Sequence, residues 1–193
     1  IERLNAEKPD LYGGGIWDHP QLGAYYNAPG GRRGTAFASR RRLTEHVARE
    51  VKSPSPTFNC VGPAGVGTGS LAGMRALHQL SSFAHIWPFD NPDTVSRPLH
   101  LVEIFPSYYF ALAGIKPVNG AHGERENINQ ALACFGSDSV SADFQANGPD
   151  HDEADALISA AALRWFSAQS DFWSVPADAR AEGWIFGVKS ATP

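Results

Sequence analysis

The sequence lacks the features that mark membrane-spanning, exported and repeat proteins. No apolar run approaches the roughly 18 residues that a membrane-spanning helix needs. The first residues have neither the basic-then-apolar order of a signal peptide nor the Arg and Ser content of a transit peptide. The sequence also contains no internal repeat and no low-complexity tract. We therefore expect a cytoplasmic protein that does not enter a membrane.

Cysteine and methionine are scarce. Cys60 and Cys134 stand among apolar or small residues and have no metal-type spacing. This favours a reducing compartment and buried thiols, with a disulfide between them as the alternative. The one methionine is Met74, and the chain starts at Ile1. From this start we expect that an N-terminal part of the protein precedes the given sequence.

The charges of the chain are unevenly distributed. The formal net charge of -4 argues against indiscriminate coating of nucleic acid, which needs a basic surface. Between Arg32 and Lys52, however, there are seven Lys and Arg and two acids, a formal charge of +5. Between Asp138 and Asp155 there are six acids and no Lys or Arg, a formal charge of -6. A basic face and an acidic pocket can therefore exist in one protein.

The order of predicted elements indicates an α/β fold. The 193 residues, 42% of them hydrophobic, are enough for a single domain over 1–193, of which 1–34 is rich in Gly, Pro and aromatic residues and is predicted to be irregular. Strands interleaved with helices give the fold class. Helices are predicted at 35–51, 71–83, 107–114, 126–135 and from about Asp152; strands are predicted at 57–61, 85–89, 99–105 and 183–188.

The glycine-rich stretch 62–70 stands between a predicted strand and a predicted helix, where a nucleotide-binding turn belongs. It has the spacing of a phosphate-binding loop, but Thr68 replaces the required lysine. Gly67 and Gly69 also fit a dinucleotide fingerprint, with Asp90 at the distance of a ribose-binding acid. A plain loop explains the same glycines, so three interpretations stay open.

Three carboxylates are candidates for a metal site. Glu103 lies in the mostly apolar stretch "HLVEIF", where a carboxylate is expensive to bury unless it is paired, protonated or bound to a cation. Asp152 and Asp155 begin a helix whose stripe of Ala154, Leu157, Ile158, Ala161 and Trp165 is predicted to be buried. The alternatives are a Glu103 that faces solvent on an edge strand or pairs with an arginine and, for the two aspartates, a plain acidic helix cap. Convergence of the three would favour magnesium or manganese, since all ligands are oxygens.

At these residues the sequence resembles a known family. The segments "LVEIFPS", "HDEADALISAAALRWF" and "EGWIFGV", with "RLTE", "VGTGSLAG" and "IWPFD" upstream, are similar to domain-of-unknown-function family four-twenty-nine, predicted nucleases of the ribonuclease H-like superfamily. The segment "DEADAL" also resembles the C-terminal helix of Holliday-junction resolvases. The resemblance implies a mixed sheet flanked by helices. It also explains the glycines as a family feature.

The resemblance implies a function and a set of roles. Asp152 and Asp155 would match the helix acids of the superfamily, and Glu103 the strand acid. Nothing in 1–34 resembles the superfamily's first strand with its Asp, which implies that the chain lacks its N-terminal strands. We therefore predict a metal-dependent nuclease or phosphodiesterase with Mg²⁺ or Mn²⁺ on these three acids.

Two further sets of residues complete the sequence-based prediction. Arg40, Arg41 and Arg42 would contact phosphates of a nucleic acid, with a solvated helix face as the alternative. His151 would assist proton transfer or cap the helix. A non-catalytic protein of the same fold that binds a nucleotide or nucleic acid is the second functional hypothesis, and a dinucleotide-dependent oxidoreductase is the third.

Overall fold

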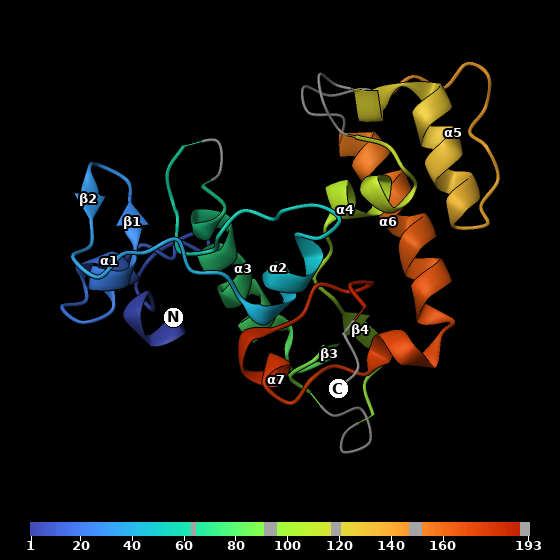
Figure 1. Ribbon diagram of the computed structural model, residues 1–193. Helices are drawn as coiled ribbons and strands as arrows, with labels where there is room; N and C mark the ends of the chain where they lie inside the picture. The colour runs from blue at the N-terminus through green and yellow to red at the C-terminus, as the bar shows by residue number, and fades with distance from the viewer. Residues whose placement is uncertain (63–64, 91–95, 117–120, 147–151, 190–193) are drawn as a thin grey trace. The chain divides into compact units, whose positions relative to one another are not determined.

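The computed structural model describes residues 1–62, 65–90, 96–116, 121–146 and 152–189. Its fold is mixed α/β, with more helix than strand (Figure 1). The chain divides into two compact units. Unit 1 comprises residues 1–42 and 55–101, and unit 2 comprises residues 43–54 and 102–193. Within the described residues we find no helix with the length and apolarity to cross a membrane.

The first 34 residues form short helices and a hairpin. The helices are η1 (Glu2–Leu4), α1 (Gly15–Asp18) and η2 (Gly23–Tyr25). The strands β1 (Asn27–Ala28) and β2 (Arg32–Arg33) then pair antiparallel. Gly30 and Gly31 both have positive φ, 77° and 73°, which is the backbone conformation that lets the chain reverse between the two strands. The segment that was predicted to be irregular is therefore partly ordered by local turns.

The rest of unit 1 contains one long helix and a second small sheet. Helix α3 (Gly67–Leu80) begins four residues earlier than the periodicity predicts. Strands β3 (Ala84–Ile86) and β4 (Leu99–Leu101) pair in parallel, with His85 opposite His100. The predicted strand 57–61 supplies only a single bridge, between Asn59 and Asn27.

The core of unit 1 joins its N-terminal segment to helix α3. Ile16, Cys60 and Leu71 are buried together, and Trp17 and Tyr26 pack against them. Burial raises the pKa of the Cys60 thiol, so this cysteine is a packing residue. Cys134 is exposed, and both cysteines are free thiols. The expectation of thiols rather than a disulfide is confirmed, but the expected burial holds only for Cys60.

Unit 2 is built around its longest helix, drawn in orange in Figure 1. Helix α6 (Asp152–Ser167) contacts α4 (Pro106–Leu112), α5 (Arg125–Cys134) and the 3-10 helix η4 (Ser170–Trp173). Pro106 occupies the first turn of α4, where a missing N–H costs no helical bond. The remaining described elements of unit 2 are α2 (Leu43–Ala48), η3 (Ala121–Gly123) and α7 (Ala179–Glu182).

Aromatic side chains fill the core of unit 2. Tyr109 is completely buried and lies against Phe135 and Phe166. The segment 183–188 is buried but is not the predicted strand, because it makes only one bridge, from Ile185 to Glu103. The Tyr109 hydroxyl donates to the carbonyl of Phe186 at 2.7 Å, so a side chain satisfies this buried backbone group instead of a strand partner.

Two further predictions about elements are wrong. The helix predicted over 35–51 is confined to α2, since the residues before Leu43 form a turn and coil. The mostly apolar composition of the strand predicted at 99–105 indicates a central strand covered on both faces, and this prediction is wrong. The strand part of this stretch has only three residues, and Leu99 is 50% exposed. Part of the apolar run forms the second strand of a two-stranded parallel sheet.

Candidate functional site

Glu103 lies just before helix α4, on the surface of unit 2. Its side chain is exposed, while its backbone forms the parallel bridge to Ile185 and its carbonyl accepts the N–H of Phe186 at 2.9 Å. Burial is the main cause that raises the pKa of Tyr109, and the charge of Glu103 adds to it. Glu103 lies near Tyr109 because Phe186 is bonded to both, its N–H donating to the Glu103 carbonyl and its own carbonyl accepting from the Tyr109 hydroxyl.

The two helix acids stand where the sequence predicts them, in the first turn of α6. Asp152 is exposed and Asp155 is half-buried. Ala154, Ile158 and Ala161 of the predicted stripe are buried, which confirms most of the helical register. The last position is wrong: Phe166 is 2% exposed, whereas Trp165 is 40% exposed. The period of 3.6 residues alone favours position 165, so the burial of Phe166 follows from its contacts with Tyr109 and Phe135 rather than from helical spacing.

The three predicted ligands do not form one ligand set. Tyr109, which is linked to Glu103 through the backbone of Phe186, packs on Phe166 in the last turn of α6. Asp155 lies three turns earlier, about 16 Å along the helix axis. In the part of the chain that the structure describes, no group of three or more His, Cys, Asp or Glu is arranged to hold a metal ion. Metal binding and catalysis by Glu103, Asp152 and Asp155 stay predictions, and His151 lies outside the described residues.

The glycine that begins α3 has a structural explanation. A Cβ on Gly67 would meet the backbone oxygen of Thr57 and lie 2.6 Å from the sulfur of Cys60, so only glycine allows this close approach. The N–H of Gly67 donates to Asn59 at 2.8 Å and is therefore occupied. Asp90, the expected ribose ligand, accepts from the N–H of Ile86 and pairs with Arg97 at 2.7 Å. Residues 63–64 lie outside the described part.

The predicted phosphate-binding arginines precede α2 in unit 1. Arg40 is exposed, donates to the carbonyl of Ala36, and places its guanidinium carbon 5.3 Å from the ring centroid of Tyr25. Arg41 and Arg42 are half-buried. Arg40 thus combines an aromatic partner with an exposed side chain.

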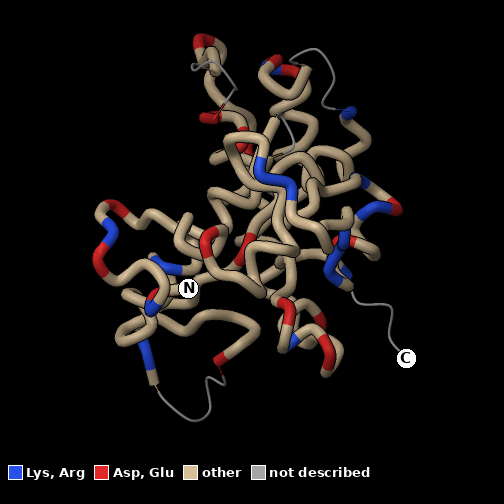
Figure 2. The backbone as a smooth tube through the Cα atoms, turned by 90° about the vertical axis from the view of Figure 1, so that its left-hand side faces the viewer, with Lys and Arg blue, Asp and Glu red and all other residues tan. Residues whose placement is uncertain are grey.

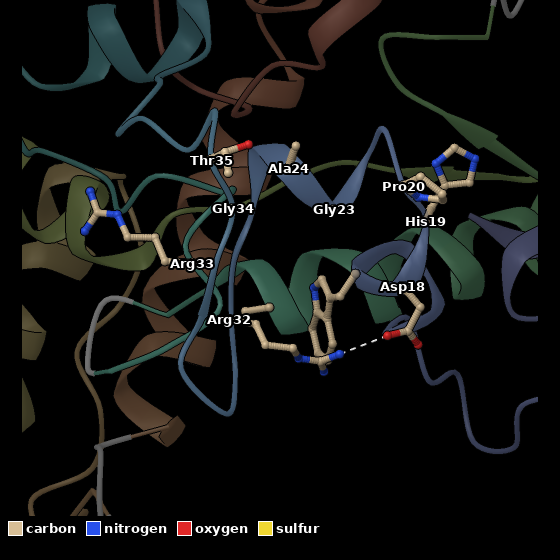
Figure 3. A pocket seen from close by; sticks show the side chains of 11 residues that line it. Asp18, His19, Pro20, Gly23, Ala24, Arg32, Arg33, Gly34 and Thr35 are labelled. Atoms are coloured by element: carbon tan, nitrogen blue, oxygen red, sulfur yellow. Dashed lines mark hydrogen bonds and ion pairs between the residues drawn. The ribbon is translucent and has the colours of Figure 1, made fainter.

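Two more arginines, both in strand β2 of the hairpin, lie over aromatic rings from outside the hairpin. The guanidinium carbon of Arg32 is 5.6 Å from the ring centroid of Trp17, and that of Arg33 is 5.0 Å from the ring centroid of Phe37. Figure 3 shows that the two neighbouring side chains point in opposite directions, as expected in a strand. We call Trp17, Tyr25, Phe37 and the three arginines the arginine–aromatic set; its arginines are Arg32, Arg33 and Arg40.

A hollow of about 330 Å³ lies beside the hairpin in unit 1 (Figure 3). Arg32 spans one side of it and forms an ion pair with Asp18 at 2.9 Å. Both side chains are largely exposed, at 52% and 69%. The lining residues are Trp17, Asp18, His19, Pro20, Gly23, Ala24, Ala28, Arg32, Arg33, Gly34 and Thr35.

Charge is segregated between the two units, and Figure 2 marks these charges along the backbone. Unit 1 has nine Lys and Arg against six Asp and Glu, a formal charge of +3. Unit 2 has seven against fourteen, a formal charge of -7. Within unit 1, residues 15–42 contain five arginines and one acid, Asp18. The arginine–aromatic set belongs to this most basic stretch.

Sequence reasoning assigned no function to the residues before Gly34. The signal was present, because Arg32 and Arg33 follow a run of aromatic residues at close spacing. Pairing of guanidinium groups with rings depends on the fold, however, and the sequence does not specify it. Comparisons with protein-family models, with curated proteins and with solved structures found no match for this chain.

Proposed function

We propose that unit 1 binds single-stranded nucleic acid through the arginine–aromatic set. One observation carries this proposal: three arginines each lie over an aromatic ring within a stretch that contains five arginines and one acid. Proteins that bind single strands combine positive charge, which follows the phosphates, with planar groups on which bases stack. The arginine–aromatic set supplies both.

Stacked arginines suit a single strand better than a duplex. In a duplex the base faces are hidden, whereas an unpaired base can stack on an aromatic ring or on a guanidinium plane. Arg33 and Arg40 are exposed and already lie over the rings of Phe37 and Tyr25, so less side-chain freedom is lost when a ligand binds. Their positive charge contacts phosphates as well.

The test is a binding titration with fluorescently labelled oligonucleotides. We expect single strands to bind more tightly than the matching duplex, with an affinity that falls as salt rises because counterions are released. Arg33→Gln and Arg40→Gln should each weaken binding, and Arg33→Lys should restore only part of it, since lysine keeps the charge but lacks the plane. Arg180→Gln, in unit 2, is the control with the same change in charge.

The binding proposal also predicts which substitution leaves the oligonucleotide affinity unchanged. Asp152→Asn should leave oligonucleotide binding unchanged, since Asp152 belongs to unit 2. Equal losses of affinity from Arg33→Gln and Arg180→Gln would contradict the proposal, because they would show a response to net charge alone. So would tighter binding of the duplex than of the single strand.

Metal-dependent cleavage by a ribonuclease H-like unit 2 is a second proposal. It is supported by the carboxylates that α6 offers in its first turn and by the formal charge of -7 on this unit, both of which favour cations. With Mn²⁺ present, branched, single-stranded and RNA-containing substrates should be cut, and Asp155→Asn should abolish cutting. Asp171→Asn is the control, since it removes an acid outside the first turn of α6. Intact substrates after incubation with wild-type protein and Mn²⁺ would rule this proposal out.

A further inference from the structure

We infer that the hollow beside the β1–β2 hairpin selects guanine in the bound strand, with the Asp18 carboxylate accepting hydrogen bonds from the base. This inference rests on the proposed function, and it adds base selectivity to it. Asp18 and Arg32 face one another at the hollow, as Figure 3 shows.

Asp18 is the single acidic residue between Gly15 and Arg42. A carboxylate repels a phosphate, so at this position it lowers the affinity for the backbone of a nucleic acid. The edge of a base is different, because the amino and ring N–H groups of bases donate hydrogen bonds and a carboxylate is a pure acceptor. The chemistry of Asp18 therefore points to a base edge rather than to a phosphate.

Arg32 holds both the carboxylate and a stacking plane in place. It donates from Nη1 to Oδ1 of Asp18 at 2.9 Å, and its guanidinium lies over the ring of Trp17. Among the described residues, no contact to Oδ2 of Asp18 is recorded, and the Asp18 side chain is 69% exposed. A base that stacks on the outer face of the guanidinium brings its edge toward Asp18.

Guanine presents the edge that fits a carboxylate best. Its N1–H and its amino group are adjacent donors, so they can bind the two oxygens of one carboxylate together. Adenine and cytosine place a ring acceptor beside their amino group, and this acceptor faces the second oxygen unfavourably. Thymine and uracil place their one ring N–H between two carbonyls. The carboxylate therefore discriminates among bases by the pattern of donors.

The hollow has the size for such a ligand. About 330 Å³ is at the small end of pockets for small molecules, which suits one nucleotide. Two glycines form part of its wall, and an added Cβ on Gly23 or on Gly34 would meet backbone atoms of Trp17 or Ala24. Glycine at these two positions lets the segments that form the wall approach one another closely.

The experiment measures binding of the whole chain to oligothymidine that carries one variable central base. We expect the strand with guanine to bind about tenfold more tightly than the strand with thymine, adenine or cytosine, as for a good bidentate contact. Inosine, which lacks the amino group, should lose most of this gain. Asp18→Asn should abolish the preference without weakening binding to oligothymidine. Asp10→Asn, an exposed acid of the same unit, is the control and should keep the preference.

The outcomes separate this inference from the proposed function. Equal affinity for all four central bases, with the salt dependence intact, overturns the guanine site and leaves single-strand binding standing. No binding of any strand overturns both. If Asp18→Asn weakens all strands equally, Asp18 only supports the fold, and the inference fails. Competition by guanosine monophosphate but not by adenosine monophosphate gives an independent reading on the unmodified chain, and equal competition overturns the inference.

Discussion

Glu2 and Arg75, which are 73 residues apart in the sequence, form an ion pair through two hydrogen bonds. Nε of Arg75 donates to Oε2 of Glu2 at 2.8 Å, and Nη2 donates to Oε1 at 3.0 Å. The Arg75 side chain is only 5% exposed, and its Nη1 also donates to the carbonyl of Tyr12 at 2.8 Å. One buried guanidinium therefore fastens the N-terminal segment to helix α3.

This ion pair predicts a loss of stability in acid. The hydrogen bond from Arg75 is the main cause that lowers the pKa of Glu2 in the folded state. A carboxyl whose folded pKa lies below its unfolded value of about 4.3 adds stability above that pH, and this stability is lost as the pH falls through the folded pKa. The midpoint temperature of thermal unfolding should therefore fall more steeply between about pH 5 and about pH 3 for the wild type than for Glu2→Gln. Glu7→Gln should keep the wild-type profile.

Two glycines of α3 should respond to alanine in opposite directions. Gly67→Ala would place a Cβ against Thr57 and Cys60, and we expect it to lower the free energy of unfolding by about 1–3 kcal/mol. Gly73→Ala meets no atom within 4 Å and should raise it by about 0.5–1 kcal/mol, since alanine is the better helix former. Urea unfolding followed by tryptophan fluorescence measures both. Two changes of the same sign would contradict the close approach at Gly67.

The buried face of α6 can be tested at neighbouring positions. Phe166→Ala should cost about 3–5 kcal/mol of stability, because it empties a site inside the aromatic core. Trp165→Ala should cost clearly less, since 40% of that side chain is already exposed. Chemical unfolding of the two variants gives the comparison. A larger loss for Trp165→Ala would show that the helix presents the face predicted from the sequence.

Tyr109 should make the stability of unit 2 depend on alkaline pH. Its hydroxyl donates to the Phe186 carbonyl, so Tyr109→Phe should cost about 1–3 kcal/mol at neutral pH by leaving that buried carbonyl without its partner. Burial raises the pKa of Tyr109 in the folded state. The wild type should then lose stability as the pH rises above about 10, where the unfolded tyrosine ionises, and Tyr109→Phe should show a smaller loss. Tyr25→Phe, at an exposed position, should retain the wild-type slope.

Local sequence patterns predicted three helices of unit 2 well. Helices were expected at 107–114 and 126–135 and from about Asp152, and α4, α5 and α6 are found there. These helices follow from hydrogen bonds and apolar spacing within a few residues of one another. The error at the end of α6 concerns the packing face alone, at Trp165 and Phe166.

Strands were predicted less well, because a strand exists only where a partner pairs with it. The stretches 57–61 and 183–188 have the apolar and β-branched residues of strands, but each makes only one bridge. Backbone groups of the second stretch are satisfied by side chains instead: Ile185 donates to the Thr44 hydroxyl, and Phe186 accepts from Tyr109. Composition does not reveal such partners.

The candidate sites, like the strands, depend on contacts between residues that are distant in the sequence. The sequence predicted three acids in a metal site, and the structure locates Asp155 at one end of α6 and Tyr109, with Glu103 near it, at the other. The arginine–aromatic set was not predicted, although its arginines are plain in the sequence. Ring and guanidinium meet there only because the hairpin turns at Gly30 and Gly31 and brings Arg32 back to Trp17.

The sequence by itself determined α4, α5 and α6, the α/β class and the separation of basic from acidic stretches, because each depends on residues that are neighbours in the chain. The tertiary structure alone decided that Arg32 meets Trp17 and Asp18, and that Glu2 meets Arg75. Contacts of this kind need the chain to close loops, and the packing of whole elements sets which loops close. The sequence specifies the chemistry of each side chain, but the folded chain determines which distant side chains are in contact.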